Sequence, residues 1–260
     1  MTKTVAISAG ASGIGRAIAE SFIADGMNVF VCDVDTAAVA DFKAKNPKAF
    51  AMTTDVRDTD AIQSFFDLIK KETGRLDILI NNAGIAGPTA KIEDIAIDAW
   101  RDTIDIDLNS FFYFSRLAIP MVRNAGGGSI VNIASNAAFF GFPMRSAYAV
   151  SKWGIIGLTK TMAMELGEDD IRVNAICPGS VEGDRINRVI AKDAEARNLS
   201  IEDVRREYQS QSSLKTFVTK DDIVAMVQFL TGPTGRRISG QAIGLDGHTE
   251  GLSLHNLKGI

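Results

Sequence analysis

Three side chains with complementary chemistry occur in one stretch of the sequence, in the order Ser135, Tyr148 and Lys152. Tyr148 and Lys152 are four residues apart, so a helix would place them on the same face, one turn from each other. A lysine ammonium beside a phenol favours the phenolate, which is the form that acts as a general base. The Ser135 hydroxyl can hydrogen-bond a substrate oxygen as charge develops on it. The array therefore predicts a hydride-transfer enzyme, although a Tyr-x3-Lys pair by itself also occurs by chance on solvated helices.

A glycine-rich turn, from Gly10 to Gly15, lies between a short apolar run at 4–8 and a helical pattern at 16–25. Glycines let a backbone approach a pyrophosphate closely, and the free amides at a helix N-terminus bind its negative charge. The turn therefore predicts a dinucleotide site. Its predicted contacts are Ala9, Gly10, Ser12, Gly13, Ile14 and Gly15.

Asp33 ends the second predicted strand, 18 residues after Gly15. At this spacing a carboxylate accepts hydrogen bonds from both ribose hydroxyls of NAD and repels the 2′-phosphate of NADP. The next residue, Val34, is not basic. The sequence therefore predicts NAD as the cofactor, with Asp33 and Val34 at its ribose. The alternative is that Asp33 only caps the helix that follows.

Short apolar runs alternate with amphipathic stretches along the chain, which indicates βαβ units with right-handed crossovers. The predicted strands are 4–8, 28–33, 49–53, 78–81, 129–134, 172–177 and 241–245. Such units form a parallel sheet that helices cover on both faces. The predicted fold class is therefore α/β, with residues 1–260 in a single domain.

Residues 183–220 interrupt this alternation, because two charged helical segments follow one another without a strand between them. Ser200 is typical of the N-cap of the second segment. A helical insertion before the last strand predicts a lid over a substrate pocket. A solvated surface excursion explains the same charge pattern.

The composition argues against several classes of function. The chain has 260 residues, 46% of them hydrophobic, with a formal net charge of -4 and a pI of about 5.3, so a nucleic-acid partner is not expected. No apolar stretch reaches the length of a membrane helix, so no membrane contact is expected. Cys32 and Cys177 each lie in an apolar run, which fits reduced thiols in a cytoplasmic protein. His248 and His255 lack metal-ligand spacing, so no metal site is predicted.

The motifs of the chain, taken in their order, resemble those of the short-chain dehydrogenase/reductase family, and the resemblance extends almost from end to end. It implies a seven-stranded, doubly wound sheet of the Rossmann type and a small-molecule substrate. It also implies a homotetramer, formed through the helix that carries Tyr148 and through the last strand. The further cofactor contacts that it implies are Asp55 and Val56 at the adenine, Asn82, Ala83 and Gly84 after the central strand, and Pro178, Gly179 and Val181 near the nicotinamide.

In the mechanism that the resemblance implies, Tyr148 accepts the alcohol proton while a hydride passes to the nicotinamide. Lys152 binds the ribose hydroxyls and favours the phenolate of Tyr148, and Ser135 orients the substrate oxygen.

Three positions depart from the family pattern. Ala9 stands at a usual glycine, and Gly183 at a usual threonine near the cofactor phosphates. Asp107 stands where the family has an asparagine that holds a relay water through its backbone, so we place Asp107 with the catalytic residues. Its carboxylate favours the charged form of Lys152, or the residue is only a packing variant of its helix.

The segments after Ser135 and before Tyr148 are predicted to line the substrate pocket. The residues that they supply are Asn136, Ala137, Phe139, Phe140, Met144 and Arg145. The phenylalanines are also typical of a buried core. Arginines suit the binding of an anionic group or remain solvated, and those near the pocket are Arg145, Arg185 and Arg188. The predicted substrate contacts are Ser135, Asn136, Ala137, Arg145, Tyr148 and Arg185.

Together these observations predict an NAD-dependent alcohol dehydrogenase for a small secondary alcohol, such as a polyol, a sugar or a hydroxy acid. A 3-oxoacyl-thioester reductase is the nearest enzymatic alternative, but such enzymes normally use NADPH, which Asp33 disfavours. A nucleotide-binding relative without turnover is another alternative. The complete set of Ser135, Tyr148 and Lys152 disfavours it.

Overall fold

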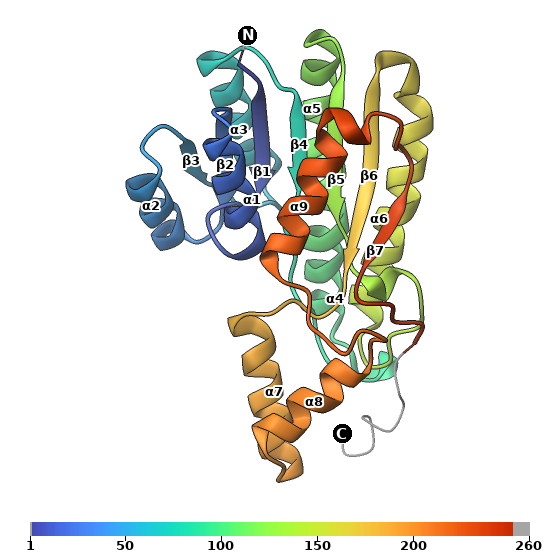
Figure 1. The fold of residues 1–260 in the computed structure, drawn as a ribbon. Helices are drawn as coiled ribbons and strands as arrows, with labels where there is room; N and C mark the ends of the chain where they lie inside the picture. The colour runs from blue at the N-terminus through green and yellow to red at the C-terminus, as the bar shows by residue number, and fades with distance from the viewer. Residues whose placement is uncertain (1, 252–260) are drawn as a thin grey trace.

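A seven-stranded parallel sheet forms the centre of the computed structural model, which describes residues 2–251, with the backbone alone at Arg185 and Ala196 (Figure 1). The strands are β1 (Thr4–Ser8), β2 (Asn28–Asp33), β3 (Phe50–Thr53), β4 (Ile78–Asn81), β5 (Gly128–Ile133), β6 (Ile171–Pro178) and β7 (Ala242–Leu245). The helices are α1 (Gly13–Ala24), α2 (Thr36–Lys45), α3 (Thr59–Glu72), α4 (Ile97–Ile104), α5 (Ser110–Asn124), α6 (Ser146–Glu165), α7 (Asp184–Arg197), α8 (Ile201–Ser210) and α9 (Lys220–Thr231). The strand order is β3-β2-β1-β4-β5-β6-β7.

The predicted fold class is confirmed, and each predicted strand is present with both ends within one residue of the expected position. The helix after the first strand begins at Gly13, earlier than the predicted residue 16. The difference arises because the chain enters the helix directly after Ser12, whose backbone is extended. The last glycines of the turn therefore belong to the first turn of α1.

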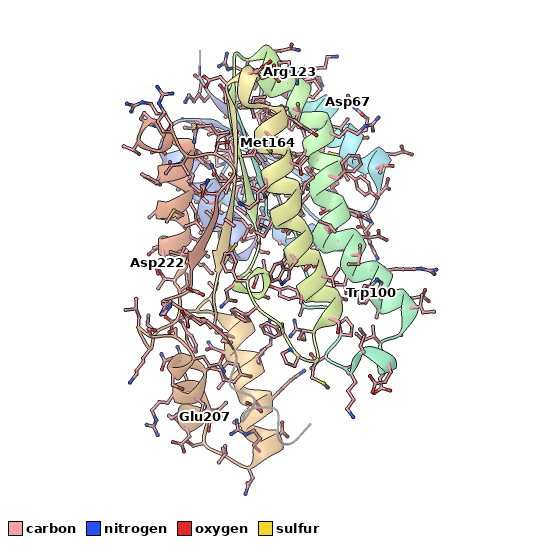
Figure 2. The ribbon with its side chains drawn as sticks, turned by 90° about the vertical axis from the view of Figure 1, so that its right-hand side faces the viewer. Asp67, Trp100, Arg123, Met164, Glu207 and Asp222 are labelled. Carbon is pink, nitrogen blue, oxygen red and sulfur yellow. The ribbon has the colours of Figure 1, made fainter. Side chains whose placement is uncertain are left out.

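Side chains of β1 alternate between the two faces of the sheet, as the period of a strand requires. Val5 and Ile7 join a core cluster with residues of α1 and α9, whereas Ala6 joins a second cluster with residues of α3 and α5. Figure 2 shows the sheet nearly edge-on, with α9 on one side and α5 and α6 on the other. Both faces are thus covered, which explains why the strands are continuous apolar runs.

The chain reverses its direction of winding between β1 and β4, which lie side by side at the centre of the sheet. In sheets of this kind a crevice forms at the carboxyl ends of the two central strands and receives the ligand. A buried hydrogen-bond network fixes this part of the sheet. The Asn81 amide donates to Asn132 Oδ1 at 2.9 Å, and the Asn132 amide donates to the hydroxyl of Thr159 on α6 at 2.9 Å.

Helices α7 and α8 extend beyond the carboxyl ends of the strands (Figure 1). The predicted pair of helices within residues 183–220 is therefore present, and the Ser200 hydroxyl caps α8 by accepting from the Asp203 amide. A parallel bridge between Val181 and Val218 ties the two ends of this segment together. Gly183, at the N-cap of α7, has a φ of 142°, a conformation that favours glycine and explains the absence of threonine there. That the segment acts as a lid stays a prediction.

Both cysteines are buried and free, as predicted. None of the helices in the described part of the chain is long and apolar enough to cross a lipid bilayer.

Candidate active site

The three residues of the predicted array lie at the ends of neighbouring elements. Ser135 follows β5, and Tyr148 and Lys152 lie one turn apart on α6. Lys152 Nζ is 5.4 Å from the centre of the Tyr148 ring, and the side chain of Lys152 is almost completely buried. The Ser135 hydroxyl accepts from the Ala137 amide at 3.2 Å and donates to Asn136 Oδ1 at 3.4 Å. A phenol, an ammonium and a hydroxyl are thus brought to the same end of the sheet.

Asp107 is fully buried and faces Lys152 from a π-helical turn, Asp105–Asn109, between α4 and α5. Its Oδ2 is 3.5 Å from Lys152 Nζ, and its Oδ1 accepts a 2.7 Å hydrogen bond from the Ile85 amide. Gly84 leaves little space beside this pair, since a Cβ there would lie 3.3 Å from Lys152 Nζ. The carboxylate therefore contacts both the lysine and the loop after β4, rather than only packing within its own helix.

The turn after β1 is tightly built at Ala9 and Gly15. Ala9 has a φ of 49°, in the left-handed region, which costs a residue with a side chain roughly 1–2 kcal/mol. The Ala9 methyl packs against the core cluster that includes α3 and α5, so the departure from glycine adds contacts on that side. At Gly15 a Cβ would lie 2.2 Å from the Ala9 carbonyl oxygen, so a side chain is excluded there.

Ser8 and Asn82 hold this turn against the loop after β4. The Ser8 hydroxyl accepts hydrogen bonds from the amides of Asn82 and Ala83, at 3.0 and 3.2 Å. The Asn82 side-chain amide donates to the carbonyls of Ser8 and Ala9. The hydroxyl that Ser8 shares with the usual threonine is thus used within the protein.

Two features leave the turn suited to a dinucleotide. The Ser12 hydroxyl, at the N-cap of α1, makes no capping bond to the described residues, so the first amides of the helix can bind an anion. Asp33 is buried at the end of β2, where its carboxylate accepts from the amides of Ala11 and Asp35, each at 3.2 Å. Val34 beside it is 65% exposed. The carboxylate thus lies next to the glycine turn and is not limited to capping α2, whose N-cap is Asp35.

The residues that the family resemblance places at the adenine have different surroundings. Val56 is buried in the cluster that includes α3 and α5. Asp55 binds the Arg57 guanidinium at 2.7 Å, and this hydrogen bond, more than any other cause, lowers the pKa of the Asp55 carboxyl. Asp55 therefore carries a charge that Arg57 already neutralises.

The turn after β6 packs against the last turn of the chain that the structure describes. At Gly179 a Cβ would lie 2.8 Å from the Asp246 Cβ, so Pro178 and Gly179 lie close to residues that follow β7. Val181 packs against the cluster that includes α1 and α9. Burial raises the pKa of the nearby Cys177 thiol to about 12, so this cysteine stays a neutral thiol.

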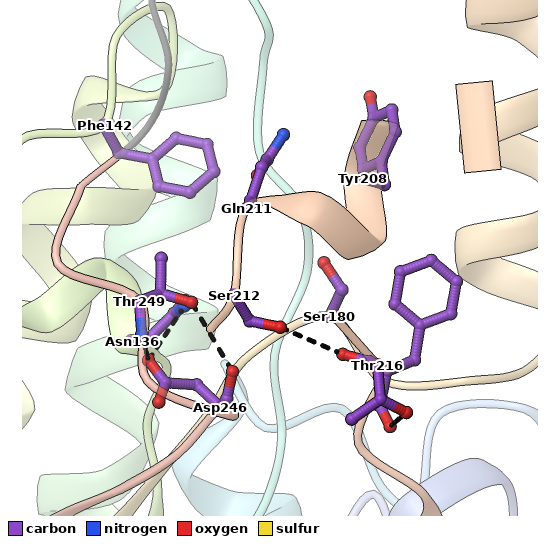
Figure 3. A pocket seen from close by; sticks show the side chains of 10 residues that line it. Asn136, Phe142, Ser180, Tyr208, Gln211, Ser212, Thr216, Asp246 and Thr249 are labelled. Carbon is purple, nitrogen blue, oxygen red and sulfur yellow. Dashed lines mark hydrogen bonds between the residues drawn. The ribbon is translucent and has the colours of Figure 1, made fainter. Parts of the chain in front are cut away.

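A cavity of about 80 Å³ lies where the loop after β5, the segment after α8 and the last turn meet (Figure 3). Ser135, Tyr148 and Lys152 do not line it, but two of its lining residues contact members of the array. Asn136, in its wall, accepts the hydrogen bond from Ser135, and Phe142 contacts the Tyr148 ring edge-on, with 6.5 Å between ring centres. The lining residues are Asn136, Phe142, Ser180, Tyr208, Gln211, Ser212, Thr216, Phe217, Asp246 and Thr249.

Of the residues predicted to line the substrate pocket between Ser135 and Tyr148, only Asn136 lines this cavity. Asn136 lines the cavity, and Ala137 is buried beneath it, with its amide bound to Ser135. Phe139 is 41% exposed, so it is not part of the buried core, and it lies outside the lining of this cavity. Phe140 and Met144 also lie outside the cavity lining.

Of the predicted arginines, Arg145 and Arg188 are not part of the cavity lining. Arg145 donates to the Ala86 carbonyl, and its guanidinium lies 5.2 Å from the centre of the Tyr148 ring. Arg188 is exposed on α7. The side chain of Arg185, and His255, lie outside the described residues. Sequence reasoning missed Phe142 and the lining residues after 200, because only the folded chain brings these segments to Ser135.

Comparisons with known proteins show which family and fold the chain is similar to. A family model described as enoyl-(acyl carrier protein) reductase matches residues 8–249. The D-beta-hydroxybutyrate dehydrogenase of Rhizobium meliloti (strain 1021) is 34% identical over 254 residues, which are 95% of this chain and 98% of the relative. The aldohexose dehydrogenase of Thermoplasma acidophilum has a TM-score of 0.85 at 30% identity, over 95% of this chain and 93% of that one. A variant of actinorhodin polyketide ketoreductase, solved with NADPH, has a TM-score of 0.90 at 27% identity, over 96% and 98% of the two chains.

Proposed function

Because the chain belongs to the short-chain dehydrogenase/reductase family of oxidoreductases that act on CH–OH groups, we propose that it transfers a hydride between NAD and a small secondary alcohol, such as a polyol, a sugar or a hydroxy acid. The observation that carries this proposal is the position of Tyr148 and Lys152 on one face of α6, at the same end of the sheet as Ser135, with a cavity whose lining residues Asn136 and Phe142 contact Ser135 and Tyr148. Two of the relatives named above, the hydroxybutyrate and the aldohexose enzymes, are described as dehydrogenases, which favours this activity over a thioester reductase or a protein without turnover, although the ketoreductase and the family model are described as reductases.

In the proposed reaction, Tyr148 accepts the proton of the substrate hydroxyl as the carbinol carbon loses a hydride. Lys152 keeps a positive charge beside the phenol, and Ser135 donates a hydrogen bond to the substrate oxygen. For this, the Ser135 hydroxyl must turn from Asn136 to the substrate, which costs only a long hydrogen bond of 3.4 Å. The Asp107 carboxylate holds Lys152 in place through their ion pair.

The residues around the glycine turn fit a dinucleotide. The uncapped amides of α1 would hold its pyrophosphate, and the exclusion of a side chain at Gly15 keeps the backbone close to it. Further contacts would come from Val56 and from the loop that carries Asn82 and Gly84. Bound NAD supplies the acceptor for the hydride.

Asp33 is the reason for proposing NAD rather than NADP. Its buried carboxylate lies beside the turn, and the exposed neighbour Val34 offers no positive charge to a 2′-phosphate. The ketoreductase of similar fold was solved with NADPH, so the fold by itself does not exclude NADP. The preference therefore depends on these side chains and not on the fold.

We also propose a homotetramer that uses α6 and β7, in a cytoplasmic setting. Helix α6 exposes three large apolar side chains, Val150, Trp153 and Met164, which are 48%, 52% and 86% exposed. Figure 2 labels Met164 on this helix. Light scattering should then give four times the chain mass of 27.9 kDa. The two buried free thiols suit a reducing compartment.

The activity is tested by following formation of the reduced nicotinamide with a panel of polyols, sugars and hydroxy acids, with NAD and NADP in parallel. We expect oxidation of one of these classes, with NAD preferred by at least about tenfold, because like charges placed together cost several kcal/mol. Equal or better rates with NADP would refute the cofactor assignment. Binding of NAD without oxidation of any alcohol would refute the proposed activity.

A further inference from the structure

The cavity near Ser135 and Tyr148 is lined mainly by polar side chains, and these are neutral or acidic. Hydroxyl groups come from Ser180, Tyr208, Ser212, Thr216 and Thr249, amides from Asn136 and Gln211, and a carboxylate from Asp246. Two phenylalanine rings complete the wall. Among the described residues that line it, none carries a positive charge. Such a lining suits hydrogen-bonding neutral groups better than it suits an anion.

Asp246 makes the cavity unfavourable for a carboxylate. Its Oδ1 accepts from the His248 amide at 2.9 Å, and its Oδ2 accepts from the Asn136 side chain at 3.4 Å. Both bonds hold the negative charge at the cavity wall, next to the residue that binds Ser135. A substrate carboxylate in the same cavity would be repelled, because charges interact strongly where water is partly excluded.

Some lining groups remain available for a neutral partner, among them the Ser180 hydroxyl and the side chains of Tyr208 and Gln211. The Gln211 side chain and the Tyr208 hydroxyl make no hydrogen bond to other described residues, and Figure 3 shows both side chains at the cavity. Burial, as the main cause, raises the pKa of Tyr208, so its hydroxyl keeps its proton and can donate. Together they offer donors and acceptors, which is what a substrate hydroxyl needs.

The size and position of the cavity indicate what it receives. Its volume of about 80 Å³ exceeds the ~10–15 Å³ that a single water requires, so it has room for several atoms of a ligand. It adjoins Ser135 through Asn136 and Tyr148 through Phe142. A substrate whose reacting hydroxyl lies at Ser135 and Tyr148 would therefore extend its neighbouring carbons into the cavity.

We infer that the substrate is a neutral, polyhydroxylated compound of the sugar or polyol class, and that Gln211 and Tyr208 bind its hydroxyl groups beyond the one that reacts. This inference rests on the proposed function and narrows it, since it separates sugars and polyols from hydroxy acids. A carboxylate-bearing substrate does not match the wall that Asp246 and the hydroxyl groups form.

The test compares galactose and sorbitol with 3-hydroxybutyrate, by initial rates with NAD and by calorimetric binding to the complex of the enzyme with NADH. We expect a higher kcat/KM and tighter binding for the sugar or the polyol. Gln211→Ala should lower kcat/KM for these substrates about tenfold, because a hydrogen bond to a neutral group is lost. It should change kcat/KM for cyclohexanol, which has no further hydroxyl, by much less.

Gln209→Ala is the matched control, because Gln209 lies near the end of α8, two residues before Gln211 and outside the cavity lining, and it should leave all these values unchanged. Preferred oxidation or binding of 3-hydroxybutyrate would overturn the inference while leaving the proposed hydride transfer intact, and loss of that preference in Arg185→Ala would identify the anion site. If no alcohol is oxidised, the proposed function fails, and the binding comparison still decides the class of ligand.

Discussion

Asp107 and Lys152 form a buried ion pair, with 3.5 Å between Oδ2 and Nζ, and the same Nζ lies 5.4 Å from the centre of the Tyr148 ring. The carboxylate supplies a negative charge to a site whose proposed base becomes negative when it loses its proton. Asp107→Asn keeps an acceptor for the Ile85 amide but removes this charge. We expect the acid limb of the pH–rate profile for alcohol oxidation to move to lower pH, by roughly one unit, because the phenolate is then opposed less.

Asp107→Leu provides the contrast for this experiment. It leaves Lys152 buried without the carboxylate, which should cost about 3–5 kcal/mol in the free energy of unfolding and most of the activity. If Asp107→Asn has the same pH–rate profile as the wild type, the ion pair has a structural role only.

The fold and much of the proposed site could be predicted from the sequence, because the patterns that indicate them lie within short segments of the chain. Runs such as Val29 to Cys32 are apolar on both faces, which only a strand between two helix layers requires. Tyr148 and Lys152 are brought together by helix geometry alone. The cavity was not predictable, because Phe142, Gln211 and Asp246 belong to segments that meet only through tertiary packing.

Tyr148→Phe removes the phenol oxygen and keeps the ring that contacts Phe142. We expect kcat to fall by about 10²–10⁴, the range for loss of a general acid or base, with little change in the Kd for NAD. Steady-state kinetics and fluorescence titration with NADH measure the two quantities. Tyr113→Phe, on the α5 side of the core, serves as the control and should keep full activity. Activity of Tyr148→Phe near that of the control would contradict the role of Tyr148 as the base.

Cofactor preference should change when Asp33→Ala is combined with Val34→Arg. The first change removes the carboxylate that opposes a 2′-phosphate, and the second adds a positive charge at an exposed position that can hold a longer side chain. We expect the ratio of kcat/KM for NADP to that for NAD to rise at least tenfold, about 1.4 kcal/mol. Since Asp33 also accepts from Ala11 and Asp35, a thermal melt must accompany the kinetics. An unchanged ratio in a folded variant would mean that Asp33 does not contact the ribose.

Ser8 links the glycine turn to the loop after β4, and its removal should affect both stability and cofactor binding. In Ser8→Ala the amides of Asn82 and Ala83 lose their acceptor, which should cost roughly 2–6 kcal/mol, since each of the two buried donors left unpaired costs about 1–3 kcal/mol. We also expect a higher KM for NAD, because Asn82 holds the Ala9 carbonyl. Ser8→Thr keeps the hydroxyl and should retain most of both properties. Equal stability of Ser8→Ala and wild type in chemical denaturation would show that water replaces the hydroxyl.

The start of α9 should make a pH-dependent contribution to stability. The Asp222 carboxylate accepts from the amide and the hydroxyl of Thr219, and the amide bond is the larger cause of its lowered pKa. A carboxyl whose pKa is lower in the folded than in the unfolded chain stabilises the fold above its unfolded pKa, near ~3.9, and loses that effect as the pH falls through its folded pKa. Asp222→Asn should therefore cost about 1 kcal/mol at pH 7 and almost nothing at the lowest pH at which the protein stays folded. Asp221→Asn, at the preceding position of the same turn, is the control, and a cost for Asp222→Asn that stays constant with pH would assign the effect to packing instead of charge.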